Sequence, residues 1–152
     1  MIEGDILREV PPEPIALVDH SGDRDPDHKS WAKDVHIDEY EVVKGSTRAG
    51  AYVTWIILVD LVSESDDANK TGTRIRVHRR YSEFVKLREA LMSRYKKRVN
   101  EIPSLPPKSM VLRFEPKFLE TRRQGLEYFL LCVLLNPIFS HDDLVKQFVR
   151  PK

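Results

Sequence analysis

An arginine and a tyrosine that are adjacent in the sequence, Arg80 and Tyr81, are the first candidates for chemistry. Residues 74–79 before them alternate charged and apolar types as a half-buried strand does, whereas Phe84 and Leu87 after them recur at helical spacing. A guanidinium and a phenol held side by side at such a junction can bind a flat anionic group. An exposed arginine beside a core tyrosine is the simpler interpretation of these two residues alone, and both interpretations stay open.

Further cations stand in two segments that follow. Lys108 ends the segment 103–108, whose prolines predict an extended, polyproline-like path. Arg122 and Arg123 come directly after Thr121, which forms the capping-box pattern Thr-x-x-Gln with Gln124. They are thus predicted to occupy the first turn of a helix, which is the unfavourable end for a cation. An anion bound at that helix N-terminus would explain them.

Three large apolar residues, Met110, Val111 and Leu112, lie in a predicted loop beside basic residues. Packing into the core is one interpretation, and a membrane-inserting tip surrounded by cations is the other. The residues alone do not separate the two.

Signatures of common catalytic sites are missing from the sequence. It contains no glycine-rich phosphate loop, no paired cysteines at zinc-ligand spacing and no Gly-x-Ser-x-Gly motif, and its five histidines are scattered. We therefore expect no enzyme, no cofactor and no metal site.

The charge is divided unevenly along the 152 residues. Residues 1–69 hold 6 Lys and Arg against 16 Asp and Glu, residues 70–152 hold 19 against 8, and the net charge is +1. A basic second half favours an anionic partner, such as a lipid headgroup, a nucleic acid or an acidic protein. A solvated face remains an alternative.

The predicted fold class is α+β. A first strand should begin near Ala32 with an irregularity near residues 38–39, a second should span residues 51–63, and a third should span residues 74–80. Short connections make this a three-stranded antiparallel β-meander, packed against a small helical bundle with a proline-rich extended loop between helices.

Helix limits follow from capping residues. Ser82 is the predicted N-cap of a helix that runs to about Tyr95. One helical turn is expected at residues 116–119, then a core helix from Thr121 to about Asn136, and Ser140 should cap a last helix. The core helix should bury Leu126, Phe129, Leu130, Val133 and Leu134, which recur with the period of an apolar helix face.

Residues 1–32 are predicted to form a flexible, acidic, proline-containing tail before a domain at residues 33–150. The tail offers few apolar residues to offset its ordering entropy. Its segment 10–18 is nevertheless a possible docking peptide for a protein partner, through Pro12, Pro14, Ile15 and Leu17. A plain disordered linker is the alternative.

The predicted location is cytoplasmic. The longest apolar run, residues 55–59, is too short to cross a bilayer, and the first residues lack the apolar segment of a signal peptide. The single cysteine, Cys132, excludes an internal disulfide and fits a reducing compartment.

Three separated segments together carry a family resemblance. They are Arg80-Tyr81-Ser82-Glu83-Phe84, Leu105-Pro106-Pro107-Lys108 and Arg122-Arg123-Gln124-Gly125-Leu126-Glu127. In this order, on a plan of three strands followed by helices, the chain resembles the PX (phox homology) domain of sorting nexins.

The resemblance implies a phosphoinositide reader, usually of phosphatidylinositol 3-phosphate on endosomal or vacuolar membranes. It implies that Arg80 pairs with the 3-phosphate, Tyr81 packs against the inositol, Lys108 contacts the 1-phosphate and Arg122 binds the 4- and 5-hydroxyls. The loop at residues 110–112 would then enter the bilayer.

We therefore expect a non-enzymatic module that recruits its protein to endosomal or vacuolar membranes. Some small fungal adaptors of this family bind a lipid-transfer protein through a Pro-x-Pro peptide, a role open to residues 10–18. The alternative is a protein–protein interaction domain with weak or no lipid specificity. A nucleic-acid reader is less well supported, because the basic residues are not interleaved with exposed aromatics.

Overall fold

A computed structural model describes residues 30–47, 50–62, 72–109 and 111–151. The predictions for the tail, including Pro12, Pro14, Ile15 and Leu17, and for Met110 lie outside the described residues and stay predictions. None of the helices within the described part of the chain is both long and apolar enough to cross a membrane.

The sheet has the predicted three antiparallel strands in the order β1-β2-β3. They are β1 (Ala32–Val43), β2 (Tyr52–Leu61) and β3 (Arg74–Arg80). The predicted irregularity in β1 is confirmed, because the register with β2 shifts between His36 and Glu39. At this bulge the Ile37 N–H donates to the Glu127 carboxylate (2.9 Å), and the Ile37 C=O accepts from Arg123 (2.7 Å). Two side chains of a distant helix therefore hold the edge strand in place.

Helix α1 (Tyr81–Arg94) begins directly where β3 ends, and the 3₁₀ helix η5 (Lys96–Glu101) follows it. The predicted end near Tyr95 is confirmed, but the prediction of Ser82 as N-cap is wrong. The N-cap is Arg80, two residues earlier, and the Arg80 N–H donates to the carboxylate of Glu83 (3.0 Å), so that it is satisfied without a serine.

Helix α2 (Pro116–Leu134) is continuous, so the prediction of a separate turn and a new helix start at Thr121 is wrong. Pro116 occupies the first turn, where its missing N–H costs nothing, and the Thr121 hydroxyl donates instead to the Lys117 carbonyl (3.1 Å). Arg122 therefore lies beyond the first turn, and the argument from the helix dipole does not apply to it. The predicted core positions of α2 are buried, as the periodicity requires.

The last two helices are short, α3 (Pro137–Ser140) and α4 (Asp143–Phe148). Ser140 ends α3 and does not cap α4, contrary to the prediction. Asp142 is the cap, and its carboxylate accepts from the Leu144 N–H (2.9 Å).

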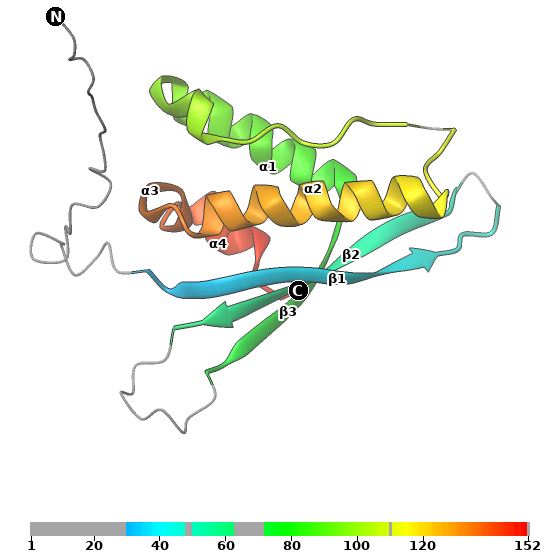
Figure 1. Ribbon diagram of the computed structural model, residues 1–152, viewed down its shortest axis with the longest axis horizontal. Coiled ribbons are helices and arrows are strands. Elements are labelled where there is room, and N and C mark those ends of the chain that lie inside the picture. The colour runs from blue at the N-terminus through cyan, green and yellow to red at the C-terminus, as the bar shows by residue number, and fades with distance from the viewer. Residues whose placement is uncertain (1–29, 48–49, 63–71, 110, 152) are drawn as a thin grey trace, which may run out of the picture.

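All the helices lie on one face of the sheet (Figure 1). The core fills the space between them, with Trp55 and Ile57 from the sheet packed in one cluster with Phe84 of α1 and Phe129 of α2. The opposite face of the sheet has no helix on it in the described part of the chain (Figure 1). The extended segment 103–109 lies against both α1 and α2, since Arg88 donates to the Pro103 carbonyl (2.8 Å) and Arg122 donates to the Pro107 carbonyl (2.8 Å).

Asp142 should make stability depend on pH. Burial by itself raises the pKa of Asp142, but hydrogen bonds from the Tyr95 hydroxyl (2.5 Å), the Leu144 N–H and Arg94 (2.7 Å) outweigh it and hold the pKa below its ordinary value. Because the folded pKa is depressed, this contribution is complete above the unfolded pKa and is lost as the pH falls through the folded one.

We expect Asp142→Asn to lower the free energy of unfolding by about 2–3 kcal/mol at neutral pH, since a charge-assisted network around a buried carboxylate is weakened. Urea unfolding should show this difference shrinking below about pH 4. Asp143, the exposed neighbour of Asp142, supplies the control, because Asp143→Asn should change stability little. A deficit that stays constant from neutral to acid pH would contradict the assignment.

Candidate functional site

A basic pocket of about 460 Å³ lies between the start of β2, the β3–α1 junction, the loop after the proline segment, and α2. It brings together all four predicted headgroup residues, Arg80, Tyr81, Lys108 and Arg122. The other residues that line it are Gly50, Ala51, Tyr52, Val53, Trp55, Ser82, Ser109, Arg113 and Phe114. These described lining residues include four cations and no carboxylate, so the pocket suits an anion.

Arg80 lines the pocket from the last position of β3, directly before the start of α1. Its guanidinium carbon lies 3.9 Å from the centroid of the Tyr52 ring, which comes from the start of the neighbouring strand. Such a cation–π contact fixes the plane of the guanidinium while leaving its N–H groups available to a ligand. Tyr52 was not predicted, because nothing local to it signals the contact.

Tyr81 and Arg122 form the inner wall of the pocket. The guanidinium carbon of Arg122 lies 3.9 Å from the centroid of the Tyr81 ring and 4.5 Å from that of Phe118. Its Nη2 donates to the Pro107 carbonyl (2.8 Å), and the Tyr81 hydroxyl donates to the Pro106 carbonyl. The proline segment thus supplies two carbonyls that orient both side chains.

Arg122 is a buried cation, with a relative exposure of 7%. Burial lowers its pKa, and its Nε has no hydrogen-bond partner among the described residues. A buried charge without a counter-ion is costly, so an anionic ligand bound anywhere in the pocket would be favoured by Arg122.

Lys108 and Arg113 also line the pocket, from the segment that carries the apolar loop. Lys108 is exposed, and Arg113 is half-buried with its guanidinium 4.8 Å from the Phe114 ring centroid. Arg113 was not predicted as a site residue, because its sequence position marks it only as a neighbour of the apolar loop.

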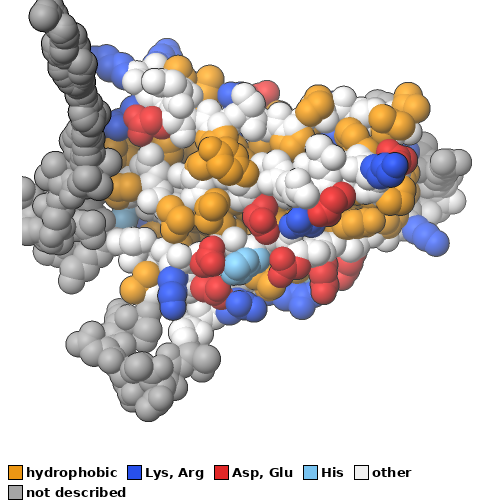
Figure 2. All heavy atoms as spheres, viewed as in Figure 1, with side chains coloured by type: hydrophobic (Ala, Val, Ile, Leu, Met, Phe, Trp, Pro, Cys, Tyr) orange, Lys and Arg blue, Asp and Glu red, His pale blue; other side chains and the backbone are white. Residues whose placement is uncertain are grey.

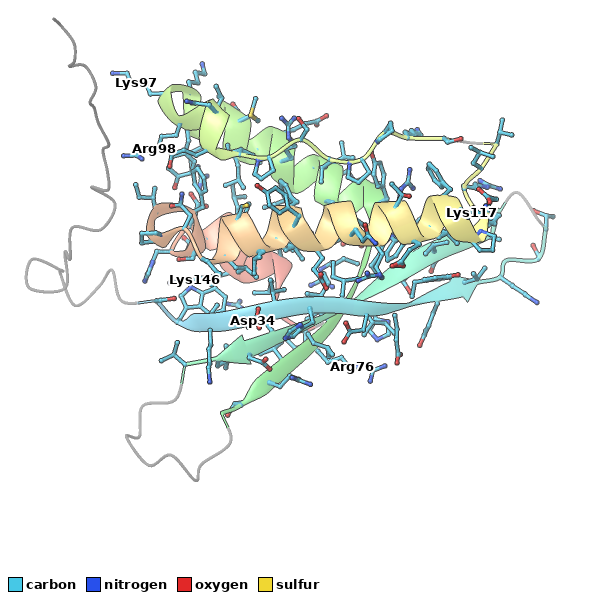
Figure 3. All side chains as sticks on the ribbon, in the orientation of Figure 1. Asp34, Arg76, Lys97, Arg98, Lys117 and Lys146 are labelled. Carbon is cyan, nitrogen blue, oxygen red and sulfur yellow. The ribbon has the colours of Figure 1, made fainter. Side chains whose placement is uncertain are left out.

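The described part of the apolar loop does not pack into the core. Val111 is 90% exposed and Leu112 is 46% exposed. A second hollow of about 320 Å³ lies alongside, between Val42 and Phe114. Hydrophobic and basic side chains gather at this end of the molecule (Figure 2), where Lys117 marks the start of α2 (Figure 3). Exposed apolar residues next to cations are typical of a membrane-binding tip.

Two further arginines serve the fold. Arg79 is buried and donates to the Phe148 carbonyl (2.8 Å) and the Arg150 carbonyl (2.7 Å), which ties the C-terminal segment to the sheet. Arg123 pairs with Glu120 (2.7 Å) and Glu127 (3.5 Å), so its place next to Arg122 is explained without a ligand.

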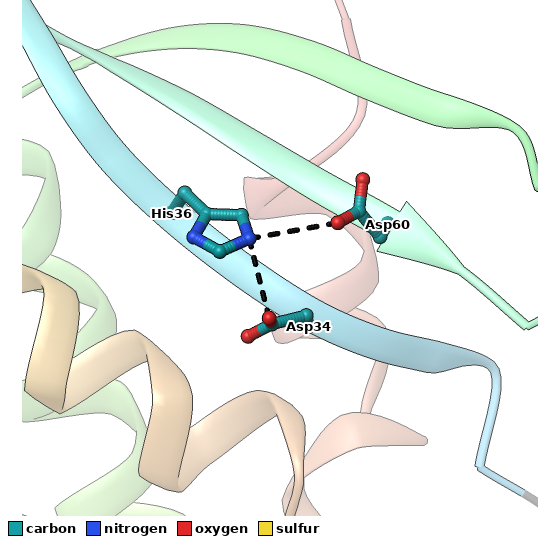
Figure 4. Close-up of side chains that lie close together, drawn as sticks. All are labelled: Asp34, His36 and Asp60. Atoms are coloured by element: carbon teal, nitrogen blue, oxygen red, sulfur yellow. Dashed lines mark ion pairs between the residues drawn. The ribbon is translucent and has the colours of Figure 1, made fainter.

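A histidine between two aspartates lies on the uncovered face of the sheet (Figure 4). His36 Nε2 is 3.2 Å from Asp34 and 3.6 Å from Asp60. The Asp60 carboxylate already accepts from Arg74 (2.6 and 3.3 Å), and this pairing keeps the pKa of Asp60 below its ordinary value. The group is therefore an ion-pair network of the sheet surface.

Gly125 controls how closely the proline segment approaches α2. A Cβ built at Gly125 would lie 2.3 Å from Pro106 Cγ, an overlap that only glycine avoids. We expect Gly125→Ala to lower the free energy of unfolding by about 1–3 kcal/mol despite alanine's better helix propensity. Binding of any ligand in the pocket should weaken as well, because Pro106 and Pro107 hold Tyr81 and Arg122.

Urea unfolding of Gly125→Ala checks this prediction. Gln124→Ala, at the exposed neighbouring position, provides the control and should be close to neutral. A Gly125→Ala protein that is more stable than the native chain, with full ligand binding, would count against the packing argument.

Comparisons with known proteins agree with this architecture. The family model for the PX domain matches residues 67–152. The chain is 33% identical over 147 residues to the endosomal/vacuolar adapter protein YPT35 of Debaryomyces hansenii, covering 94% of this chain and 88% of that protein. It is 42% identical over 93 residues to the sorting nexin MVP1 of Candida glabrata, which covers 60% of this chain and 17% of that protein.

A solved structure of a designed CISK-PX domain superposes with a TM-score of 0.62 and 28% identity, covering 78% of this chain and 99% of that one. The fold and the sequence comparisons agree, and the chain belongs to the PX domain family. The predicted resemblance and the predicted α+β fold are both confirmed.

Proposed function

We propose that this protein reads a phosphoinositide, with phosphatidylinositol 3-phosphate as the preferred headgroup, and that it recruits a partner to endosomal or vacuolar membranes. The observation that carries the proposal is the convergence of Arg80, Tyr81, Lys108 and Arg122 on one pocket from three separate segments. The names of the relatives, an endosomal/vacuolar adapter and a sorting nexin, support the same class of role.

In this proposal Arg80 binds the 3-phosphate through its planar fork of donors. Tyr81 packs against the inositol ring, Arg122 donates to the 4- and 5-hydroxyls, and Lys108 pairs with the 1-phosphate. The role of the chain is binding, since each of these groups holds an anion or a hydroxyl and none is placed to attack one.

The loop at residues 110–112 adds the second part of the binding energy by entering the bilayer. A single weak signal gives marginal membrane attachment, whereas a headgroup contact and apolar insertion together give stable recruitment. The basic pocket and the exposed Val111 and Leu112 at the same end of the molecule would engage one membrane together.

Co-sedimentation with liposomes that each carry one phosphoinositide tests the proposal. Selective binding to liposomes with phosphatidylinositol 3-phosphate is expected. Equal binding to every anionic liposome would reduce the function to bulk electrostatics. Absence of binding to all of them would favour a protein–protein interaction domain.

The N-terminal segment is proposed to carry the adaptor function through Pro12, Pro14, Ile15 and Leu17. Deletion of residues 1–29 should abolish capture of a protein partner while liposome binding is retained. The cut is placed before Trp31 because its indole N–H donates to the Ser140 carbonyl (2.8 Å) and the core begins at Ala32. Pull-down measures partner capture and co-sedimentation measures liposome binding, each for the full chain and for the chain without residues 1–29. Partner capture by the truncated chain would contradict the assignment.

A further inference from the structure

The uncovered face of the sheet has a regular distribution of charge. The strand registers place Asp34, Glu39 and Glu41 of β1 on this face, and Arg74 and Arg76 of β3 on the same face at the other edge. Acidic and basic side chains gather along this side of the molecule (Figure 2), and Arg76 points away from the helices (Figure 3). One edge of the face is therefore acidic and the other is basic.

Between these two rows the middle strand presents Ile56 and Leu58 to this face, and its Asp60 is paired with Arg74. Ile56 is buried and Leu58 is half-buried, and both line a shallow dimple of about 70 Å³ with Asp38, Glu39 and Arg76. Two copies of such a face can complement each other. A rotation of 180° about an axis along the middle strand brings the acidic row of one copy opposite the basic row of the other.

We propose that this face binds a second copy of the chain, with the two-fold axis running parallel to β2. In such a dimer β1 of one copy lies opposite β3 of the other, and residues at the same height along the strands face each other. The registers then place Asp34 opposite the second copy's Arg74, at the level of Asp60. Glu39 becomes a diagonal neighbour of the second copy's Arg76.

Other occupants fit this face less well. An axis perpendicular to the strands would set acidic row on acidic row and basic row on basic row, and like-charge contacts are costly. A uniformly acidic or basic partner, or an anionic membrane, would meet repulsion from one of the two rows. Charge complementarity thus selects a second copy and also its orientation.

The orientation has a functional consequence that rests on the proposed function. An axis parallel to the strands puts the two β1–β2 connections at the same end of the dimer, and each one borders a basic pocket through Gly50, Ala51 and Tyr52. Both pockets would then face one bilayer, so that two headgroups could be bound at once with a gain in avidity.

Charge reversal without lipid tests the dimer independently of the lipid proposal. Analytical ultracentrifugation over a range of protein concentrations should show reversible self-association. Glu39→Lys or Arg76→Glu alone should weaken it by roughly tenfold or more, because each reversal sets like charges against each other. The double variant Glu39→Lys/Arg76→Glu exchanges the rows and should restore it, a result that a general surface effect would not give.

Cross-linking adds a readout of geometry. In a Cys132→Ser background, Leu58→Cys lies next to the proposed axis and should form a disulfide between copies under mild oxidation. Lys97→Cys, on η5 at the helix side of the molecule (Figure 3), is the control and should cross-link slowly. A monomer at all concentrations, or equal cross-linking of the two cysteines, would overturn the proposal.

Discussion

Replacement of Arg80 by alanine should abolish selective binding to phosphatidylinositol 3-phosphate. The proposed fork of N–H donors to the phosphate would be lost, and truncating one partner of such a charged pair costs about 3 kcal/mol or more, which corresponds to a loss of affinity of roughly 100-fold. The fold should survive, because the Arg80 side chain is exposed and its main packing partner is the face of Tyr52. Isothermal titration with a short-chain phosphatidylinositol 3-phosphate measures the loss.

Arg98→Ala provides the matched control. It removes the same side chain and the same charge at the end of the molecule opposite to the start of α2 (Figure 3), where Arg98 pairs with Glu101 on the surface (3.0 Å). Its affinity should equal that of the native chain. A comparable loss in both variants, or an unchanged Arg80→Ala protein, would remove Arg80 from the site.

The second large effect is expected at the apolar tip. The double variant Val111→Asp/Leu112→Asp should lower partitioning onto liposomes by roughly 100-fold, since about 3 kcal/mol of apolar insertion is lost and two carboxylates face an anionic surface. Folding stability should hardly change, because neither side chain is buried. Titration with the short-chain lipid should give the native affinity.

A control with the same number of charges comes from two other exposed valines. Val62 is 46% exposed and Val99 is 37% exposed. The variant Val62→Asp/Val99→Asp should bind liposomes nearly as well as the native chain. If this control loses partitioning to the same extent, the effect is one of net charge and the apolar tip has no special role.

Periodicity predicted the elements of the fold well, whereas single-residue capping signals predicted their ends poorly. The alternation in β3 and the apolar face of α2 are imposed by burial over many residues, and both are present in the structure. Ser82, Thr121 and Ser140 are each good cap residues by type, but a cap is chosen by backbone geometry and by competing partners. Glu83 and Asp142 satisfied the helix ends in two of these cases, and in the third Pro116 had already started the helix.

The pocket was predicted through its charged groups and not through the residues that hold them. Arg80, Lys108 and Arg122 are cations in the three segments that carry the family resemblance, and the structure places them together. Tyr52, Phe118 and the carbonyls of Pro106 and Pro107 act through contacts between segments distant in sequence, which spacing along the chain does not reveal. Pairing of Thr54 with Arg80 is the signal that would have pointed to the start of β2.

The hydrogen bonds to Pro106 and Pro107 have a thermodynamic consequence. These carbonyls orient Tyr81 and Arg122 within the fold itself, so the cost of ordering the two side chains is part of folding and not of binding. Binding of a headgroup by charge-assisted hydrogen bonds to such a rigid pocket should release heat. The association constant for the headgroup should therefore fall on warming even while the fold stays intact, whereas the contribution of apolar insertion should not weaken in the same way.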